Sequence, residues 1–256
     1  MKEFDAEVSE RIRSYADCDE LRNAASKFVE LSTVPKYSYN FKWMGRPIIQ
    51  YPQDMVAVQE LIWSVRPDLV VETGIAHGGS LVLTASIMAM MDMSDAIASG
   101  ETIDPATSSR RVLGVDIDIR SHNRAAIESH PMSSRISMIE GSSLDAGVIK
   151  RVHEFASGFK KVMVFLDSNH THDHVLDELK SYSGLVSPGS YCVVFDTLVE
   201  DLPDSLYPDR PWGPGNNPKT AVHEFLKTNS EFEIDKSIDD KLLITVAPDG
   251  YLRRVR

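Results

Sequence analysis

Apolar positions follow two different spacings along this chain of 256 residues. Before residue 66, two segments have helical spacing, residues 1–30 with Val8, Ile12 and Tyr15 on one face and Met55–Val65 with Asp54 as the expected N-cap. An irregular aromatic stretch lies between them. From residue 68 onward, short continuous apolar runs end in an acid or a glycine. Such runs are typical of strands buried on both faces of a parallel sheet. They are Asp68–Gly74, Val112–Asp116, Ile136–Gly141, Lys161–Asp167 and Ser190–Asp196.

Helical segments alternate with these runs, which predicts an α/β fold with a doubly wound, Rossmann-like and mostly parallel sheet. The predicted helices are Ser80–Met91, His122–Ser129, Asp145–Ala156, His172–Ser181 and Thr220–Lys227. Near the C-terminus, Lys241–Ala247 and Tyr251–Val255 flank the turn sequence Pro248-Asp-Gly. This arrangement predicts that the sheet finishes with an antiparallel hairpin.

The chain divides into two predicted parts. Residues 1–50 form a helical and aromatic N-terminal extension, and residues 51–256 form the ligand-binding domain. Within that domain, residues 201–219 hold five prolines and two glycines, so we expect a long loop. Its aromatic, amide and basic side chains suit a sugar ring, and we expect it to cover the substrate. A rigid proline-rich connector is the alternative.

Composition and charge narrow the classes of function. Apolar types make up 42% of the chain and charged types 25%, which is ordinary globular composition. The net charge of −11 repels phosphate backbones, so we expect no nucleic-acid partner. The N-terminus lacks the apolar run of a signal peptide, and no apolar stretch is long enough to span a membrane. The two cysteines, Cys18 and Cys192, have no metal-binding spacing, and we expect reduced thiols in a cytoplasmic protein.

Acids stand at five successive predicted strand ends. In open α/β sheets ligands bind outside the carboxyl ends of the strands. Buried carboxylates are destabilising unless they are paired, so folding alone does not explain five of them. The sequence therefore predicts a binding site at this edge, carried by Glu72, Asp116, Glu140, Asp167 and Asp196.

The first of these strand ends continues into the glycine-rich turn Glu72-Thr-Gly-Ile-Ala-His-Gly-Gly-Ser80. Its glycines allow a ligand to approach the backbone, and Ser80 can cap the following helix. The turn has neither dinucleotide spacing nor the lysine of a phosphate loop, which disfavours phosphate binding. A carboxylate at Asp116 can accept both hydroxyls of a ribose.

These motifs together resemble class I S-adenosylmethionine-dependent methyltransferases, and among them the metal-dependent catechol-type O-methyltransferases. The chain resembles more closely the family known as cephalosporin hydroxylases, which includes macrolide-sugar and rhamnosyl O-methyltransferases. The resemblance extends over roughly residues 40–256. The stretches that carry it are Trp43–Asp54, Glu72–Ser80, Asp167–Val175, Val193–Thr197 and Gly215–Val222, with Val115-Asp116, Glu140-Gly-Ser-Ser and Phe165-Leu-Asp.

The resemblance implies a binding mode for S-adenosylmethionine. Glu72, Gly74 and Ser80 would line its methionine end, and Asp116 would hold the ribose. The adenine would lie along Gly141, Ser142 and Ser143.

The resemblance also implies a divalent cation, with Asp167, Asp196 and Thr197 at metal-ligand positions. Related macrolide-sugar enzymes have an acid where this chain has Phe195. The third protein ligand is therefore left open between Thr197, an acid of Glu200-Asp201, and water. Carboxylates with water ligands suit Mg²⁺, and a hydroxyl bound to such a cation loses its proton more easily.

Three histidines follow Asp167, and His170 stands where related enzymes place the base. Because an ordinary imidazole titrates close to neutral pH, a histidine at this position suits general-base catalysis. We expect His172 and His174 to belong to the helix start and its solvent face. The same cluster leaves two other readings open. It is one residue short of a metallo-hydrolase zinc motif, and with Asp167 it suggests the iron triad of a hydroxylase.

The predicted function is a metal-dependent S-adenosylmethionine O-methyltransferase that acts on a hydroxyl of a sugar or glycosylated metabolite. A metal-dependent hydroxylase or hydrolase, and a non-catalytic sugar-binding protein on the same fold, are the alternatives. The N-terminal helices are amphipathic and are followed by the aromatic segment Tyr37–Trp43. Their apolar faces must be buried against another surface, so we expect a homo-oligomer.

Overall fold

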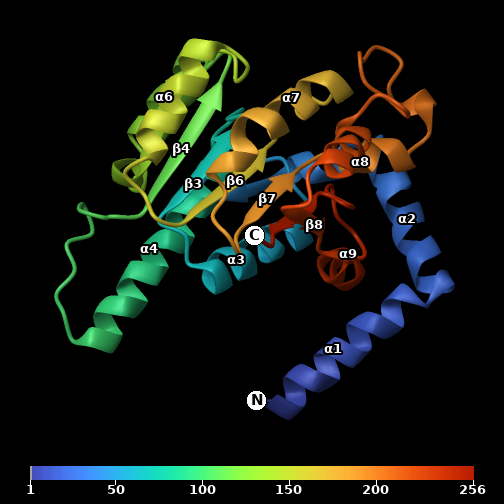
Figure 1. The fold of residues 1–256 in the computed structure, drawn as a ribbon, viewed down its shortest axis with the longest axis horizontal. Helices are drawn as coiled ribbons and strands as arrows, with labels where there is room; N and C mark the ends of the chain where they lie inside the picture. The colour runs from blue at the N-terminus through green and yellow to red at the C-terminus, as the bar shows by residue number, and fades with distance from the viewer. Residues whose placement is uncertain (1) are drawn as a thin grey trace.

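The computed structural model describes residues 2–256 and contains a seven-stranded sheet in the order β5-β4-β3-β6-β7-β9-β8 (Figure 1). The first five strands in this order run parallel, while β9 is antiparallel to both β7 and β8. The predicted α/β, mostly parallel fold is confirmed. The strands of this sheet are β3 (Leu69–Thr73), β4 (Arg111–Asp116), β5 (Ile136–Glu140), β6 (Val162–Leu166), β7 (Tyr191–Val194), β8 (Phe232–Ile234) and β9 (Tyr251–Arg254).

Helices cover both faces of the sheet, because the central strands are apolar on both sides. Every residue of β3 and β6 is buried. Val70 packs into a core with α3 and α4, while its neighbour Val71 enters the opposite core with α6, α7 and α8. The helices are α1 (Lys2–Ala16), α2 (Asp19–Thr33), α3 (Pro52–Val65), α4 (Gly79–Ser99), α5 (Ser121–Glu128), α6 (Ala146–Ala156), α7 (His172–Tyr182), α8 (Pro218–Thr228) and α9 (Lys236–Leu242).

Short 3₁₀ turns complete the chain. They are η1 (Tyr37–Asn40), η2 (Ser133–Arg135), η3 (Ser183–Leu185), η4 (Thr197–Asp201) and η5 (Asp204–Leu206). The predicted long loop therefore contains η5, followed by an isolated bridge between Gly213 and Asn216.

The N-terminal helices and a small hairpin lie outside the sheet. In Figure 1, α1 extends away from the sheet, and it contacts α9. The hairpin consists of β1 (Phe41–Trp43) and β2 (Arg46–Ile48) and packs on the start of α4. A Cβ atom at Gly79 would lie 2.1 Å from the Pro47 carbonyl oxygen, so only glycine permits this approach. Arg46 then donates to the His77 carbonyl at 2.9 Å, which joins the hairpin to the turn after β3.

Two predictions about local structure were wrong, and one residue explains both. Asp54 does not cap α3, which begins at Pro52 with Tyr51 at the N-cap. Its carboxylate is buried instead and accepts hydrogen bonds from Thr245 Oγ1, from Val246 N at 2.9 Å and from Tyr251 Oη at 2.9 Å. These bonds hold residues 245–246 against α3. The segment Lys241–Ala247 therefore forms no strand, and the antiparallel partner of β9 beyond β7 is β8.

Within residues 2–256, α4 alone has the length and apolar composition of a membrane-spanning helix. Half of its apolar window is buried inside the protein, because α4 packs between α3 and the sheet. We therefore interpret it as a core helix. It continues past the predicted end at Met91 to Ser99, where Gly100 takes a left-handed conformation.

Candidate active site

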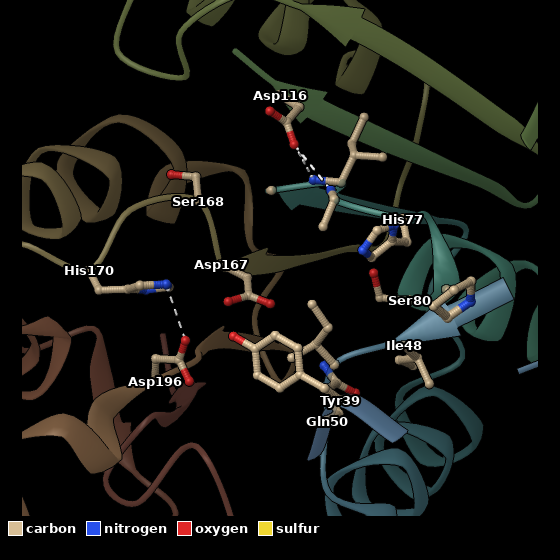
Figure 2. A pocket seen from close by; sticks show the side chains of 16 residues that line it. Tyr39, Ile48, Gln50, His77, Ser80, Asp116, Asp167, Ser168, His170 and Asp196 are labelled. Atoms are coloured by element: carbon tan, nitrogen blue, oxygen red, sulfur yellow. Dashed lines mark hydrogen bonds and ion pairs between the residues drawn. The ribbon is translucent and has the colours of Figure 1, made fainter. Parts of the chain in front are cut away.

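The carboxyl ends of the parallel strands border a cavity of about 240 Å³ (Figure 2). One wall is the turn after β3, and a second wall consists of residues that follow β6 and β7. The third wall comes from the N-terminal extension and carries Tyr39, Ile48 and Gln50. A boundary between residues 50 and 51 would thus run through the wall of this cavity.

The turn after β3 is fixed by Asp116. Its Oδ2 accepts the amide hydrogens of Ile75 at 2.8 Å and Ala76 at 3.2 Å, and its Oδ1 accepts that of Asp118 at 3.1 Å. Gly74 has a φ of +89°, and a Cβ atom there would lie 2.0 Å from the Asp167 carbonyl oxygen. The two strand ends that frame the cavity can therefore approach each other only because residue 74 is glycine.

Glu72 lies behind this turn with one oxygen unpartnered. Ser80 Oγ donates to Oε1, whereas Oε2 is buried without a partner among the described residues. Burial raises the pKa of Glu72 to about 8. Ser80 was predicted to cap α4, and that prediction was wrong because the helix begins at Gly79 with Gly78 at the N-cap. A buried acid with a free oxygen suits a cationic ligand group.

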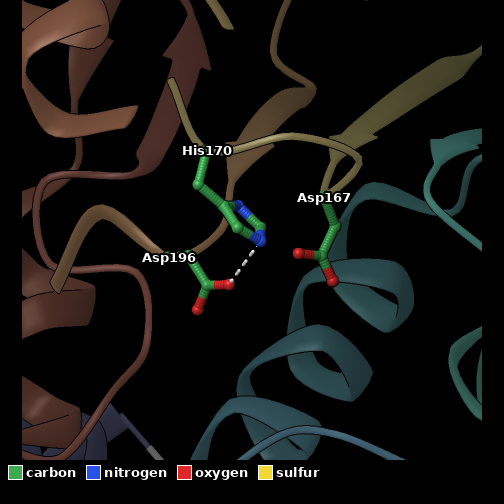
Figure 3. A group of neighbouring side chains, drawn as sticks. All are labelled: Asp167, His170 and Asp196. Carbon is green, nitrogen blue, oxygen red and sulfur yellow. Dashed lines mark ion pairs between the residues drawn. The ribbon is translucent and has the colours of Figure 1, made fainter. Parts of the chain in front are cut away.

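Three side chains from different segments converge beside the turn (Figure 3). Asp167 follows β6, His170 lies in the next loop and Asp196 follows β7, and one ligand atom from each lies within 4.8 Å of the others. The Nε2 atom of His170 is 3.2 Å from Oδ2 of Asp196. This group could hold a metal ion.

Electrostatics also favour a cation at this position. Removal from water and the negative charges of Asp196 and Glu72 raise the pKa of Asp167 well above its usual range. A divalent cation would offset that repulsion. Two carboxylates with space for water fit Mg²⁺ or Mn²⁺, and a cluster with a single histidine does not match the two-histidine triad of nonhaem iron.

Thr197, the residue predicted as a third ligand, lies outside this cluster. Its side chain is fully buried and its hydroxyl donates to the Pro248 carbonyl at 2.6 Å. His170 takes the third place in the cluster instead. Glu140 also lies outside the site, because its carboxylate forms an ion pair with Arg124 on the surface, with an N–O distance of 2.7 Å.

The other two histidines turn away from the cluster. His172 Nδ1 lies 2.8 Å from Thr220 Oγ1, at the start of α8. His174 was expected on the solvent face, which is wrong. Its Nε2 lies 3.1 Å from both Ser143 Oγ and Ser168 Oγ. His174 thus bridges the loops after β5 and β6.

The predicted adenine-binding residues lie beside the cavity rather than on its wall. Gly141 donates its amide hydrogen to the Asp116 carbonyl at 2.8 Å. The Ser142 hydroxyl accepts from the Leu144 amide at 3.3 Å, and Ser143 is 5% exposed. The structure therefore joins this loop to Asp116 and His174.

Sequence reasoning missed the N-terminal wall. Tyr39, Ile48 and Gln50 precede the first predicted strand of the sheet, and their spacing carries no site signal. The stretch Trp43–Asp54 supported a family resemblance but gave no role to any single residue. His77 is a further wall residue that the turn sequence alone did not distinguish.

Comparison with known proteins identifies the family. The family model described as Rhamnosyl O-methyltransferase/CmcI matches residues 35–255. The chain belongs to this family. The predicted resemblance is thereby confirmed, and so, at the level of the family, is the prediction of an S-adenosylmethionine-dependent O-methyltransferase.

Curated relatives and solved structures agree with this assignment. Rhamnosyl O-methyltransferase of Mycobacterium tuberculosis (strain ATCC 25618 / H37Rv) is 29% identical over 213 residues, which cover 83% of this chain and 77% of the relative. The protein of the same name from Mycobacterium leprae (strain TN) is 27% identical over 213 residues, covering 83% and 82%. The apo structure of CmcI matches with a TM-score of 0.57 at 17% identity, covering 85% and 77%. Its Mg–SAM structure has a TM-score of 0.55 at 16% identity, covering 85% and 78%, and these structural likenesses show the shared fold.

Proposed function

We propose that this protein is a divalent-metal-dependent O-methyltransferase that transfers the methyl group of S-adenosylmethionine to a hydroxyl of a sugar or glycosylated metabolite. The observation that carries the proposal is the shared cavity. The cluster Asp167, His170 and Asp196 borders the same space as the turn Gly74–Ser80. Curated relatives named rhamnosyl O-methyltransferases support the substrate class.

The turn side of the cavity supplies contacts for the methyl donor. The free oxygen of Glu72 can accept a hydrogen bond from the amino group of the methionine end. Asp116 lies at the cavity wall and keeps acceptor capacity for a ribose hydroxyl, since each carboxylate oxygen has two lone pairs. Gly141, Ser142 and Ser143 follow the neighbouring strand and would border the adenine.

The cluster side of the cavity supplies the acid–base chemistry. A bound cation would lower the pKa of the acceptor hydroxyl and hold it near the methyl donor. Asp167 and Asp196 would hold that cation. His170 would accept the hydroxyl proton, and the imidazolium so formed would face the Asp196 carboxylate 3.2 Å away.

The loop 201–219 supports a sugar acceptor. The Trp212 ring meets His170 edge to face at 4.8 Å, and the Arg210 guanidinium lies 5.1 Å from the Trp212 ring centre. This loop therefore reaches the cluster. An aromatic face beside charged groups suits the apolar side and hydroxyls of a pyranose ring.

The alternative hydrolase and hydroxylase functions have less support. Both need more than one histidine at a single metal ion. Within the described residues, only His170 joins the candidate cluster, while His172 and His174 hydrogen-bond elsewhere.

We also propose that the protein is a cytoplasmic homo-oligomer. Large apolar side chains remain exposed on the N-terminal helices and the segment that follows, among them Phe4, Leu31 and Val34. A second copy would remove them from water. A monomer mass in light scattering at micromolar protein would contradict this proposal.

The decisive experiment is a transfer assay. The protein is incubated with Mg²⁺, labelled S-adenosylmethionine and a panel of nucleotide sugars and glycosides. We expect label in a sugar product, and none when a chelator is present. Calorimetry should show adenosylhomocysteine binding that Asp116→Ala weakens. Binding of NAD without binding of adenosylhomocysteine would contradict the proposal.

A further inference from the structure

Gln50 is a buried residue whose amide oxygen makes no hydrogen bond within residues 2–256. It lies on the cavity wall and is only 3% exposed. An unpartnered buried amide oxygen is destabilising, and native proteins rarely keep one without a ligand or a water to satisfy it. Figure 2 shows Gln50 near Tyr39, on the side of the cavity formed by the N-terminal extension.

The N-terminal ends of α3 and α4 lie on the same part of the cavity as this amide. Gln50 directly precedes Tyr51, the N-cap of α3, and Gly79 and Ser80 at the start of α4 line the same cavity. Neither helix has a side-chain cap. The first N–H groups of a helix have no partner within the helix, and they favour a carboxylate.

An acceptor for the opposite charge lies behind the turn, next to the wall residue Ser80. Ser80 donates to Glu72, whose Oε2 is buried and unpartnered, and such an oxygen favours an ammonium group. The helix starts at the cavity and the acid behind Ser80 together supply donors for an anion and an acceptor for a cation. An α-amino acid group carries both charges on one carbon atom.

We propose that Gln50 is a specificity-determining residue that recognises the amino-acid end of S-adenosylmethionine. A carboxamide carries both a donor and an acceptor, so it can donate to the carboxylate while its oxygen accepts from the ammonium group. This inference rests on the proposed function. It assigns to the N-terminal extension the selection of the complete methyl donor over the same nucleoside without its amino-acid end.

The test compares two ligands by calorimetry on the full-length protein. Adenosylhomocysteine has the amino-acid end, and 5′-methylthioadenosine lacks it. In Gln50→Leu we expect adenosylhomocysteine to bind ~10- to 100-fold more weakly, the usual value of a hydrogen bond to a charged group, and 5′-methylthioadenosine to bind as before. Gln50→Glu keeps the shape but adds a negative charge beside the carboxylate, so we expect a larger loss for adenosylhomocysteine alone.

Gln53→Leu is the matched control. Gln53 lies three residues further along the chain, its Oε1 is also unpartnered, and it is not part of the cavity wall. We expect both ligands to bind this variant as they bind the parent. Undiminished binding of 5′-methylthioadenosine also reports that each variant is folded around an intact cavity. If Gln50→Leu does not fold, Gln50→Glu decides the question.

Three results would overturn the inference. The first is unchanged adenosylhomocysteine affinity in a folded Gln50 variant. The second is an equal loss for both ligands, which would mean a role in cavity shape. The third is a higher KM for the sugar acceptor with unchanged adenosylhomocysteine affinity, which would place the amide on the acceptor. Failure of the parent protein to bind adenosylhomocysteine would instead contradict the proposed function itself.

Discussion

Asp54 and Asp167 are two acids close to the same cavity, and their surroundings differ. Asp54 is buried and accepts hydrogen bonds from Thr245, Val246 and Tyr251, and its pKa rises to about 6. Asp167 accepts no hydrogen bond at its carboxylate from residues 2–256, and neighbouring acids add to the effect of burial on its pKa. The chain satisfies the first acid by itself, while the second has capacity left for a ligand. The hydrogen bonds that each carboxylate accepts, rather than its burial, separate an acid that holds the fold from a candidate for the site.

The largest expected effect concerns the cluster acids. Asp167→Asn and Asp196→Ala should abolish methyl transfer, because each removes a carboxylate charge that would hold the proposed cation. Adenosylhomocysteine binding should remain, since its main contacts lie on the turn side. The melting temperature should stay level or rise, because each change removes a repelling charge. Activity assays, calorimetry and thermal unfolding measure these three results. A chelator should reproduce the loss and added Mg²⁺ should reverse it, and full activity of Asp196→Ala in chelator would contradict the metal mechanism.

The second prediction concerns the base. His170→Ala should lower the turnover rate ~10²–10⁴-fold, the usual contribution of a positioned base, and high pH should partly restore it. The pH profile of kcat measures this. His172→Ala is the control, because its ring hydrogen-bonds to Thr220 and leaves the cluster unchanged. Full activity of His170→Ala would move the base to another histidine or to bulk water.

The third prediction tests whether Asp54 stabilises the fold. Asp54→Ala should lower the free energy of unfolding by about 3 kcal/mol, because it leaves three buried donors without an acceptor. Denaturant unfolding monitored by circular dichroism measures the change. If Asp54→Ala instead lost activity while its free energy of unfolding stayed unchanged, Asp54 would belong with the acids of the site. The distinction drawn between Asp54 and Asp167 would then be wrong.

The smallest expected effect concerns Glu72. This acid is intermediate between Asp54 and Asp167, because one of its oxygens accepts a hydrogen bond and the other has no partner among the described residues. Its pKa rises from 4.5 to about 8 in the folded, ligand-free protein. The folded state therefore keeps a proton that the unfolded chain releases. Its contribution to stability is present below about pH 4.5 and is lost as the pH rises through about 8.

Glu72→Gln removes this loss, so the variant should gain stability over the parent as the pH rises. The difference between the two proteins should grow from about pH 4.5 to about pH 8, and the raised pKa values of Asp54 and Asp239 do not mask it because both acids are present in both proteins. Melting temperatures of both proteins across this interval measure the effect. Parallel curves would show that Glu72 is already ionised in the folded protein.

The sequence by itself determined the sheet and the positions of most candidate groups. Five continuous apolar runs became β3 to β7, because burial on both faces of a strand demands apolar residues at every position. The turn from Glu72 to Ser80 is one contiguous strand–turn–helix segment that its own glycines reveal, although Asp116 of the next strand holds its backbone. The family resemblance implied that Asp167 and Asp196 end neighbouring strands, and β6 does pair with β7.

Only the tertiary structure decided which partner each side chain meets. Asp54 lies 191 residues from Thr245, and this contact turned a predicted cap into a buried acceptor and a predicted strand into a loop held by α3. Gln50 and Tyr39 reach the cavity because the N-terminal hairpin packs on the start of α4. His170, His172 and His174 share one sequence motif, yet their rings meet three different sets of neighbours. The spacing of residues encodes the element to which they belong, whereas hydrogen-bond partners depend on packing between elements distant in sequence, which no local pattern contains.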